Sequence, residues 1–203
     1  MRHDDLDRAL VVLERGLDVG RRGSIYLYVL TVAAAVGRVY ALTGRIAEGL
    51  ELIAGSVKEA EAKNAALAHP LRLTWLGEAH LAAGEYERAS QRAEEALALS
   101  RRHKEKGQEV WILHLLGEIA ARRDPRDIEG AERFYRHAIA AAEVLGMRPA
   151  IAHCRLGLGE LEAQAKRGEA GRKHLEEAAA LFRDMGMASL QARVEEKLRG
   201  PSR

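Results

Sequence analysis

Small and apolar residues recur along this sequence at a spacing of about forty positions. A Val or Leu followed by Gly stands at 36–37, 76–77 and 116–117, and the pair returns at 158–159. Each pair is followed by a second series, whose steps of four and three positions place its members on one helical face. The four series are Gly49, Ile53 and Ser56; Ala89, Ala93 and Ala96; Ala131, Tyr135 and Ala138; and Gly171, Leu175 and Ala178. The pattern predicts four pairs of helices, with a glycine where the two helices of a pair cross.

The same pattern predicts the limits of the helices. Pro70 and Pro149 fall near the start of first helices, where a missing N–H costs little. Gly44, Gly84 and Gly168 suit the turns inside a pair. The second helices are expected over 45–63, 86–104, 128–145 and 168–185. We expect one domain over 1–203, made of a partial repeat 4–19, repeats 25–64, 69–106, 108–146 and 149–186, and a capping helix 188–199.

The repeat resembles the tetratricopeptide (TPR) motif, which reads W-x2-L-G-x2-Y followed by A-x3-F. Val36-Gly37 with Tyr40 matches the first part of the motif, and the small positions match in all four units. The Tyr position of the later units holds other residues, namely His80, Ala120 and Glu162. The resemblance covers nearly the whole chain. It implies an all-α fold, a right-handed α-α superhelix of about four helix pairs with flanking partial repeats.

The repeats are longer than the usual 34 residues of a TPR. This long period, together with the segments 76–78, 116–118 and 181–187, resembles the C-terminal TPR arms of large bacterial ATP-binding regulators and multidomain adenylyl cyclases. The resemblance implies that the chain is a fragment of a larger bacterial signalling or regulatory protein.

The amino-acid composition indicates how the core is built and which kinds of protein are disfavoured. Hydrophobic residues make up 47% of the chain but aromatic residues only 4%, so Ala, Leu, Val and Ile must build the core. The formal net charge is +2 with acids and bases interspersed, which disfavours a nucleic-acid binder with a concentrated basic stripe. A single cysteine, Cys154, allows no internal disulfide and fits a reducing compartment. The N-terminus lacks a signal peptide and no stretch is apolar enough for a membrane span, so we expect a cytoplasmic protein.

The sequence carries no catalytic motif that we recognise. It has no phosphate-binding G-x-x-x-x-G-K-[ST] loop, no H-E-x-x-H helix and no G-x-S-x-G elbow. His153 and Cys154 are the nearest approach to a metal-ligand cluster, but adjacent residues on a helix point about 100° apart. His80 stands at a core aromatic position, which favours a buried histidine with a satisfied hydrogen bond. We expect no enzyme activity, no metal and no cofactor.

The concave wall of such a solenoid is the expected binding surface. In the family that the chain resembles, the first helices line this wall, and side chains about one turn from the packing glycine face the groove. The groove-facing positions of that family can be transferred to the matching positions of each repeat in this chain. The expected groove residues are then Arg38, Thr74, Glu78, Trp111, His114, Glu118, Arg122, His153, Glu160 and Gln164.

Two features of this set bear on the partner. Glu78, Glu118 and Glu160 each follow a packing glycine and form a ladder of carboxylates, which would favour a basic partner through charge-assisted hydrogen bonds. The competing interpretation is that Glu stands there as a solvated helix former. Trp111 fits either an exposed binding aromatic or a side chain packed against the neighbouring repeat.

The function expected from the sequence is therefore a non-catalytic scaffold that binds a protein or peptide in its groove. One alternative is the small-ligand sensor arm of a transcriptional regulator or cyclase. Another is a nucleic-acid-binding solenoid, which the mixed charge disfavours. Open helical faces at the two ends would also allow a homo-oligomer.

Overall fold

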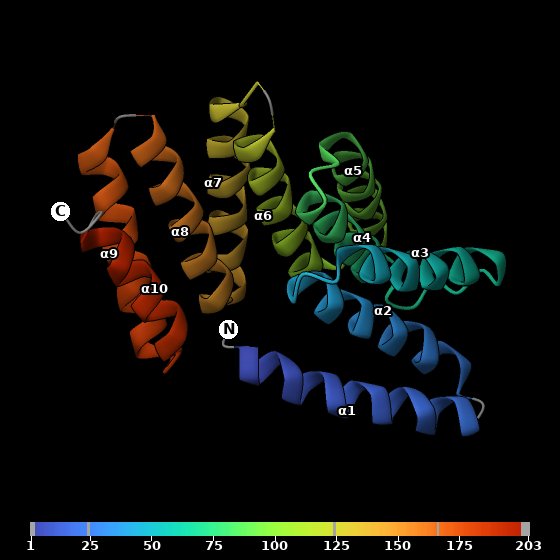
Figure 1. The fold of residues 1–203 in the computed structure, drawn as a ribbon. Helices are drawn as coiled ribbons and strands as arrows, with labels where there is room; N and C mark the ends of the chain where they lie inside the picture. The colour runs from blue at the N-terminus through green and yellow to red at the C-terminus, as the bar shows by residue number, and fades with distance from the viewer. Residues whose placement is uncertain (1–2, 24, 124, 166, 200–203) are drawn as a thin grey trace. The chain divides into compact units, whose positions relative to one another are not determined.

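The computed structural model describes residues 3–23, 25–123, 125–165 and 167–199. These residues form ten helices and no strand (Figure 1). In chain order the helices are α1 (His3–Arg22), α2 (Tyr26–Leu42), α3 (Ile46–Ala62), α4 (His69–Ala82), α5 (Tyr86–His103), α6 (Lys106–Arg122), α7 (Ile128–Leu145), α8 (Arg148–Gln164), α9 (Gly168–Asp184) and α10 (Ala188–Arg199). The all-α class predicted from the sequence is confirmed.

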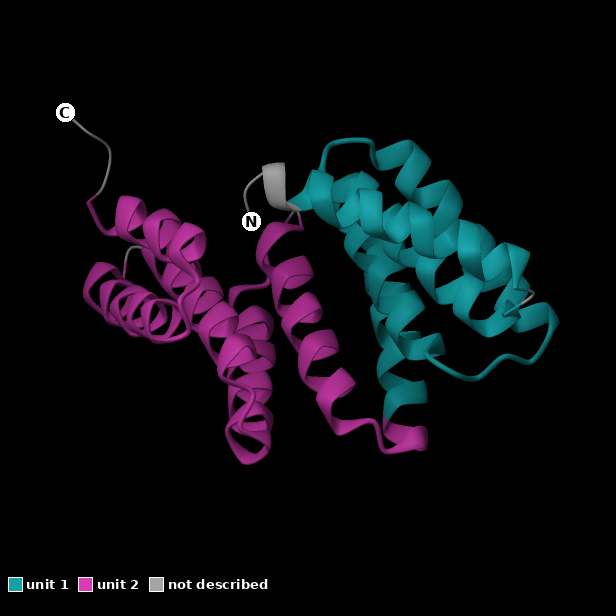
Figure 2. Ribbon diagram, turned by 90° about the horizontal axis from the view of Figure 1, so that it is seen from below, with its two compact units in different colours: residues 1–100 teal, residues 101–203 magenta. Residues whose placement is uncertain are grey.

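The chain divides into two compact units, Met1–Ser100 and Arg101–Arg203 (Figure 2). Unit 1 holds α1 to α4 and most of α5, and unit 2 holds α6 to α10. The assignment of 1–203 to one domain stays a prediction. The ends of that range, 1–2 and 200–203, lie outside the described residues.

The helix limits agree closely with the sequence pattern. Each of the four second helices begins and ends within one residue of its predicted range. Pro70 and Pro149 stand in the first turns of α4 and α8, as expected. Gly44 and Gly84 occupy left-handed turns with φ of 90° and 76°. Gly168 does not act as a turn residue, because it is the first residue of α9.

Glycines bring the two helices of a pair together at backbone distance. A Cβ added to Gly37 of α2 would lie 2.8 Å from the Gly49 carbonyl oxygen, and one on Gly49 of α3 would lie 2.5 Å from the Gly37 oxygen. In unit 2, α8 and α9 repeat the arrangement, with corresponding distances of 3.0 Å for Gly159 and 2.9 Å for Gly171. These contacts confirm that the glycines of these two pairs mark helix crossings.

The α6–α7 pair has a large aromatic ring at its crossing instead of a second glycine. Tyr135 of α7 stands where the other pairs have a smaller residue, and its side chain is only 2% exposed. A Cβ on Gly117 of α6 would lie 2.8 Å from the Tyr135 ring, and one on Gly157 of α8 would lie 2.5 Å from it. Two glycines on neighbouring helices thus make room for one large ring.

The last helix closes the core of unit 2. Val194 of α10 is fully buried and packs in one cluster with Leu175 and Phe182 of α9, with Leu190 and Leu198 at its edge. The face of α10 that carries Leu190, Val194 and Leu198 is therefore the face that packs.

The helix crossing predicts opposite effects for one chemical change at two positions of α3. Gly49→Ala should lower the free energy of unfolding by about 1–3 kcal/mol, because the new methyl group meets backbone atoms of α2. Gly55→Ala should raise it by about 0.5–1 kcal/mol, because nothing lies within 4 Å and Ala favours helix. Urea unfolding measures both. An unchanged midpoint for Gly49→Ala would refute the proposed crossing.

Candidate functional site

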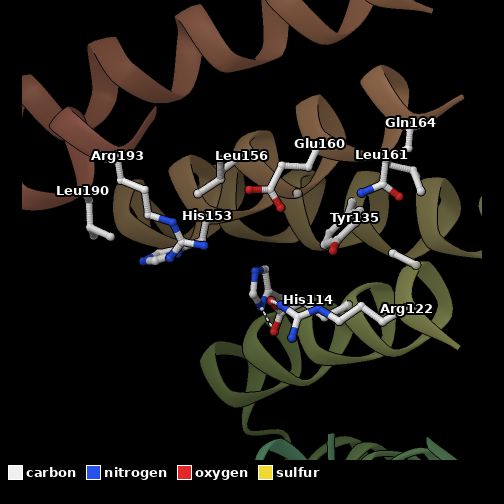
Figure 3. Close-up of a pocket in the computed structure, with 13 residues that line it drawn as sticks. His114, Arg122, Tyr135, His153, Leu156, Glu160, Leu161, Gln164, Leu190 and Arg193 are labelled. Carbon is white, nitrogen blue, oxygen red and sulfur yellow. Dashed lines mark hydrogen bonds and ion pairs between the residues drawn. The ribbon is translucent and has the colours of Figure 1, made fainter. Parts of the chain in front are cut away.

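A cavity of about 120 Å³ lies within unit 2 (Figure 3). Helices α6, α7, α8 and α10 each contribute side chains to its wall. The wall includes six of the residues assigned to the groove from the sequence, namely His114, Glu118, Arg122, His153, Glu160 and Gln164.

The packing glycines explain why these side chains meet. Glu118 directly follows Gly117 on α6, and Glu160 directly follows Gly159 on α8. Residues four positions away lie on the same helical face, which places His114 and Arg122 on either side of Glu118. Because α6 and α8 contact each other, the two rows face one cavity.

The wall also contains residues that were not expected from the sequence, among them Tyr135, Leu190 and Arg193. Tyr135 belongs to the small-residue series of α7, and Leu190 and Arg193 belong to the capping helix. A sequence signal exists for Tyr135, because it is a large residue at a small position and Gly157 provides the matching space. No comparable signal marks Arg193, whose position depends on how α10 packs on α9.

The carboxylates of the predicted ladder are all paired with cations of this chain. Glu118 accepts a hydrogen bond of 2.8 Å from Arg122. Glu160 lies 2.9 Å from the Lys197 ammonium of α10. In unit 1, Glu78 accepts two hydrogen bonds from Arg38, at 2.6 and 3.2 Å. The ladder therefore offers much less uncompensated negative charge than its sequence indicates.

Burial sets the protonation of the cavity wall. It raises the pKa of Glu118, with Arg122 and His153 opposing. Burial also lowers the pKa of His153 to about 4, with His114 adding to the effect and Glu118 opposing it. Burial and Glu118 together raise the pKa of Tyr135. At neutral pH the cavity therefore presents a neutral imidazole and a protonated phenol.

Aromatic rings support one side of the site. The His153 ring lies 5.8 Å from Trp111, 5.9 Å from His114 and 5.3 Å from Phe182, each edge to face. Trp111 itself does not line the cavity. It is partly buried and packs against Val110, Ala142 and Ala150. Of its two predicted roles, the structure shows packing against the neighbouring repeat.

The predicted groove residues of unit 1 form a separate cluster. Arg38 pairs with Glu78, and its guanidinium lies 5.6 Å from the centre of the Trp75 ring. Thr74 is 2% exposed, and its hydroxyl donates to the Pro70 carbonyl at 2.7 Å. Thr74 therefore differs from the prediction of a groove-facing side chain. Trp75 was not identified from the sequence.

Among the described residues, no three His, Cys, Asp or Glu side chains are grouped to hold a metal ion. Cys154 is fully buried, and burial raises the pKa of its thiol to about 12, which disfavours the reactive thiolate. His80 is half-buried with its Nδ1 2.6 Å from Glu85, as expected for a satisfied histidine. No helix in the described part of the chain is long and apolar enough to cross a membrane.

Comparison with known proteins identifies the fold. No protein-family model and no curated protein matches the sequence. The crystal structure of BtubC (BKLC) from P. vanneervenii matches 98% of this chain and 94% of its own, with a TM-score of 0.67 and 15% identity. This protein has a TPR-like fold.

A second TPR-like structure supports this assignment. A kinesin light chain-like protein of Podosopora anserina, with nearly identical TPR-like repeats, is matched over 89% of this chain and 88% of its own, with a TM-score of 0.59. Another crystal structure of that protein gives 0.63, over 90% and 89%. Identity is 15% in both cases, so the likeness concerns the TPR-like fold alone.

The depressed pKa of His153 predicts a pH dependence of stability. Between its ordinary pKa near 6.5 and the folded value of about 4, the unfolded chain binds more protons than the folded chain. This contribution to stability is therefore lost as pH falls from about 6.5 towards 4. The raised pKa of Glu118 acts in the opposite direction, so a His153 variant is needed to isolate the histidine.

We expect His153→Gln to lose less thermal stability than the parent protein between pH 7 and pH 5. The matched control is His137→Gln, because His137 is exposed on α7. Melting temperatures at both pH values measure the effect. An equal pH response of parent and His153→Gln would contradict the burial of a neutral imidazole.

Proposed function

We propose that this TPR-like protein is a non-catalytic interaction module that holds an extended peptide or partner helix against the first-helix face of its repeats. The observation that carries the proposal is the cavity of unit 2, whose wall gathers six of the residues assigned to that face. Helical repeats commonly use this surface to bind partners. The resemblance to regulator arms supports a role as part of a larger cytoplasmic signalling protein.

The size of the cavity favours a side chain of a partner over a free metabolite. Sites for drug-sized ligands usually enclose about 300–1,000 Å³, whereas this cavity measures about 120 Å³. A volume of that order holds about four waters, and it suits a single inserted side chain. The rest of the partner would then lie on the surface around the opening. This comparison disfavours a drug-sized ligand in this cavity.

The charge of the cavity wall disfavours the nucleic-acid alternative. The basic side chains of the site do not form a continuous stripe, because Arg122 and Lys197 are each held by a carboxylate. Phosphate backbones are bound by arrays of unpaired Lys and Arg. The proposal is therefore a protein or peptide partner.

Peptide selection tests the proposal directly. Random peptides displayed on phage are selected on the protein, and their affinities are measured by fluorescence anisotropy. Gln164→Trp places a large ring at the exposed rim of the cavity and should weaken the selected peptides by about tenfold or more. Lys173→Trp, at an exposed position of α9 outside the cavity, should leave their affinity unchanged.

Both variants should keep the unfolding midpoint of the parent, since both positions are exposed. Failure to select any peptide, or equal binding by the two variants, would contradict the proposed function.

A further inference from the structure

Two side chains of the cavity wall can donate hydrogen bonds and have no partner among the described residues. Arg193 makes no hydrogen bond or ion pair with any described residue, although it lines the cavity. The Tyr135 hydroxyl likewise has no hydrogen-bond partner among the described residues, while its side chain is 98% buried. The two carboxylates of the same wall are already paired with cations, Glu118 with Arg122 and Glu160 with Lys197.

A ligand gains affinity when it pairs with a hydrogen-bonding group that the protein leaves without a partner. The Tyr135 hydroxyl has no hydrogen-bond partner among the described residues, it belongs to a side chain that lines the cavity, and its ring is held between Gly117 and Gly157. Its raised pKa keeps the proton in place. The hydroxyl is therefore placed to donate to an acceptor that enters the cavity.

The charge balance of the site also favours an acceptor with negative charge. Three cations, Arg122, Arg193 and Lys197, face the two carboxylates Glu118 and Glu160. The surplus cation is Arg193, which has no counter-ion within ion-pair distance in the described chain. A basic group would have to displace Arg122 or Lys197 from its carboxylate before it could bind.

The two unpartnered donors lie towards different ends of the cavity. In Figure 3, Arg193 enters beside His153 and close to Leu190, whereas Tyr135 lies on the side of Arg122 and Gln164. A single small anion is therefore a poorer fit than a peptide, which offers a carboxylate to one donor and a backbone carbonyl to the other. Leu156 and Leu190 add an apolar surface for the methylene groups of a side chain.

Resting on the proposed function, we infer that the partner inserts an acidic side chain into this cavity, with its carboxylate on the Arg193 guanidinium and a neighbouring peptide carbonyl on the Tyr135 hydroxyl. Arginine suits this role because its planar group donates two parallel hydrogen bonds to a carboxylate. The inference reverses the polarity that the Glu ladder indicates from sequence alone. It also gives α10 a binding role beyond that of a cap.

Three pools of short, end-capped peptides test the inference. The pools are identical apart from a fixed central residue, which is Glu, Gln or Lys. On the parent protein, the Glu pool should bind about tenfold more tightly than the Gln pool, as expected for one charge-assisted pair. Arg193→Gln should abolish this difference. Arg199→Gln is the matched control on the same helix, because Arg199 does not line the cavity, and it should preserve the difference.

Tyr135→Phe separates the second donor from the first. It removes only the hydroxyl and leaves the ring that packs on Gly117 and Gly157, so the unfolding midpoint should stay near that of the parent. It should weaken the Glu and Gln pools by the same factor, because a backbone carbonyl is common to both.

The outcomes distinguish this inference from the proposed function. Preference for the Lys pool, or an unchanged Glu preference in Arg193→Gln, would overturn the acidic partner but leave a peptide-binding groove. A loss of Glu preference in Arg199→Gln equal to that in Arg193→Gln would also overturn it. If no pool binds and phage selection also fails, the proposed function itself is wrong.

Discussion

The close approach of helix backbones at paired glycines is the constraint on which the rest of this structure depends. At Gly37 and Gly49, and again at Gly159 and Gly171, a methyl group would meet a carbonyl oxygen at 3.0 Å or less. Such a crossing allows little sliding of one helix along the other, because only the glycines admit the neighbouring backbone. The crossing therefore fixes the register of each pair, and with it the side chains that face outward from the first helix.

The same constraint explains what sequence reasoning could predict. Spacing identifies the glycines, and steps of three and four residues then assign every helical position to a face. This was sufficient for the limits of the second helices, and for placing His114, Glu118 and Arg122 on one face of a helix. All of these features follow from the period of a helix and the position of its crossing.

Pairing between side chains of different repeats could not be predicted in this way. The position after the packing glycine holds Arg38 in one repeat and Glu78 in the next, and these two bond directly. In unit 2 the same position holds Glu118 and Glu160, so their compensation must come from elsewhere. Arg122 supplies it from the same helix, and Lys197 supplies it from α10. The reach of a long side chain to another helix leaves no trace in the period.

This difference gives the two units distinct chemical characters on the same scaffold. In unit 1, Arg38 and Glu78 satisfy each other beside Trp75, and Thr74 is buried. In unit 2, Glu118 and Glu160 are each paired with a cation, and the capping helix brings a further one, Arg193, that forms no ion pair with a described carboxylate. A row of acidic residues therefore does not by itself make an acidic surface. In unit 2, the polarity of the groove depends on the cations that neighbouring helices bring to each carboxylate. It also depends on Arg193, which has no ion-pair partner among the described residues.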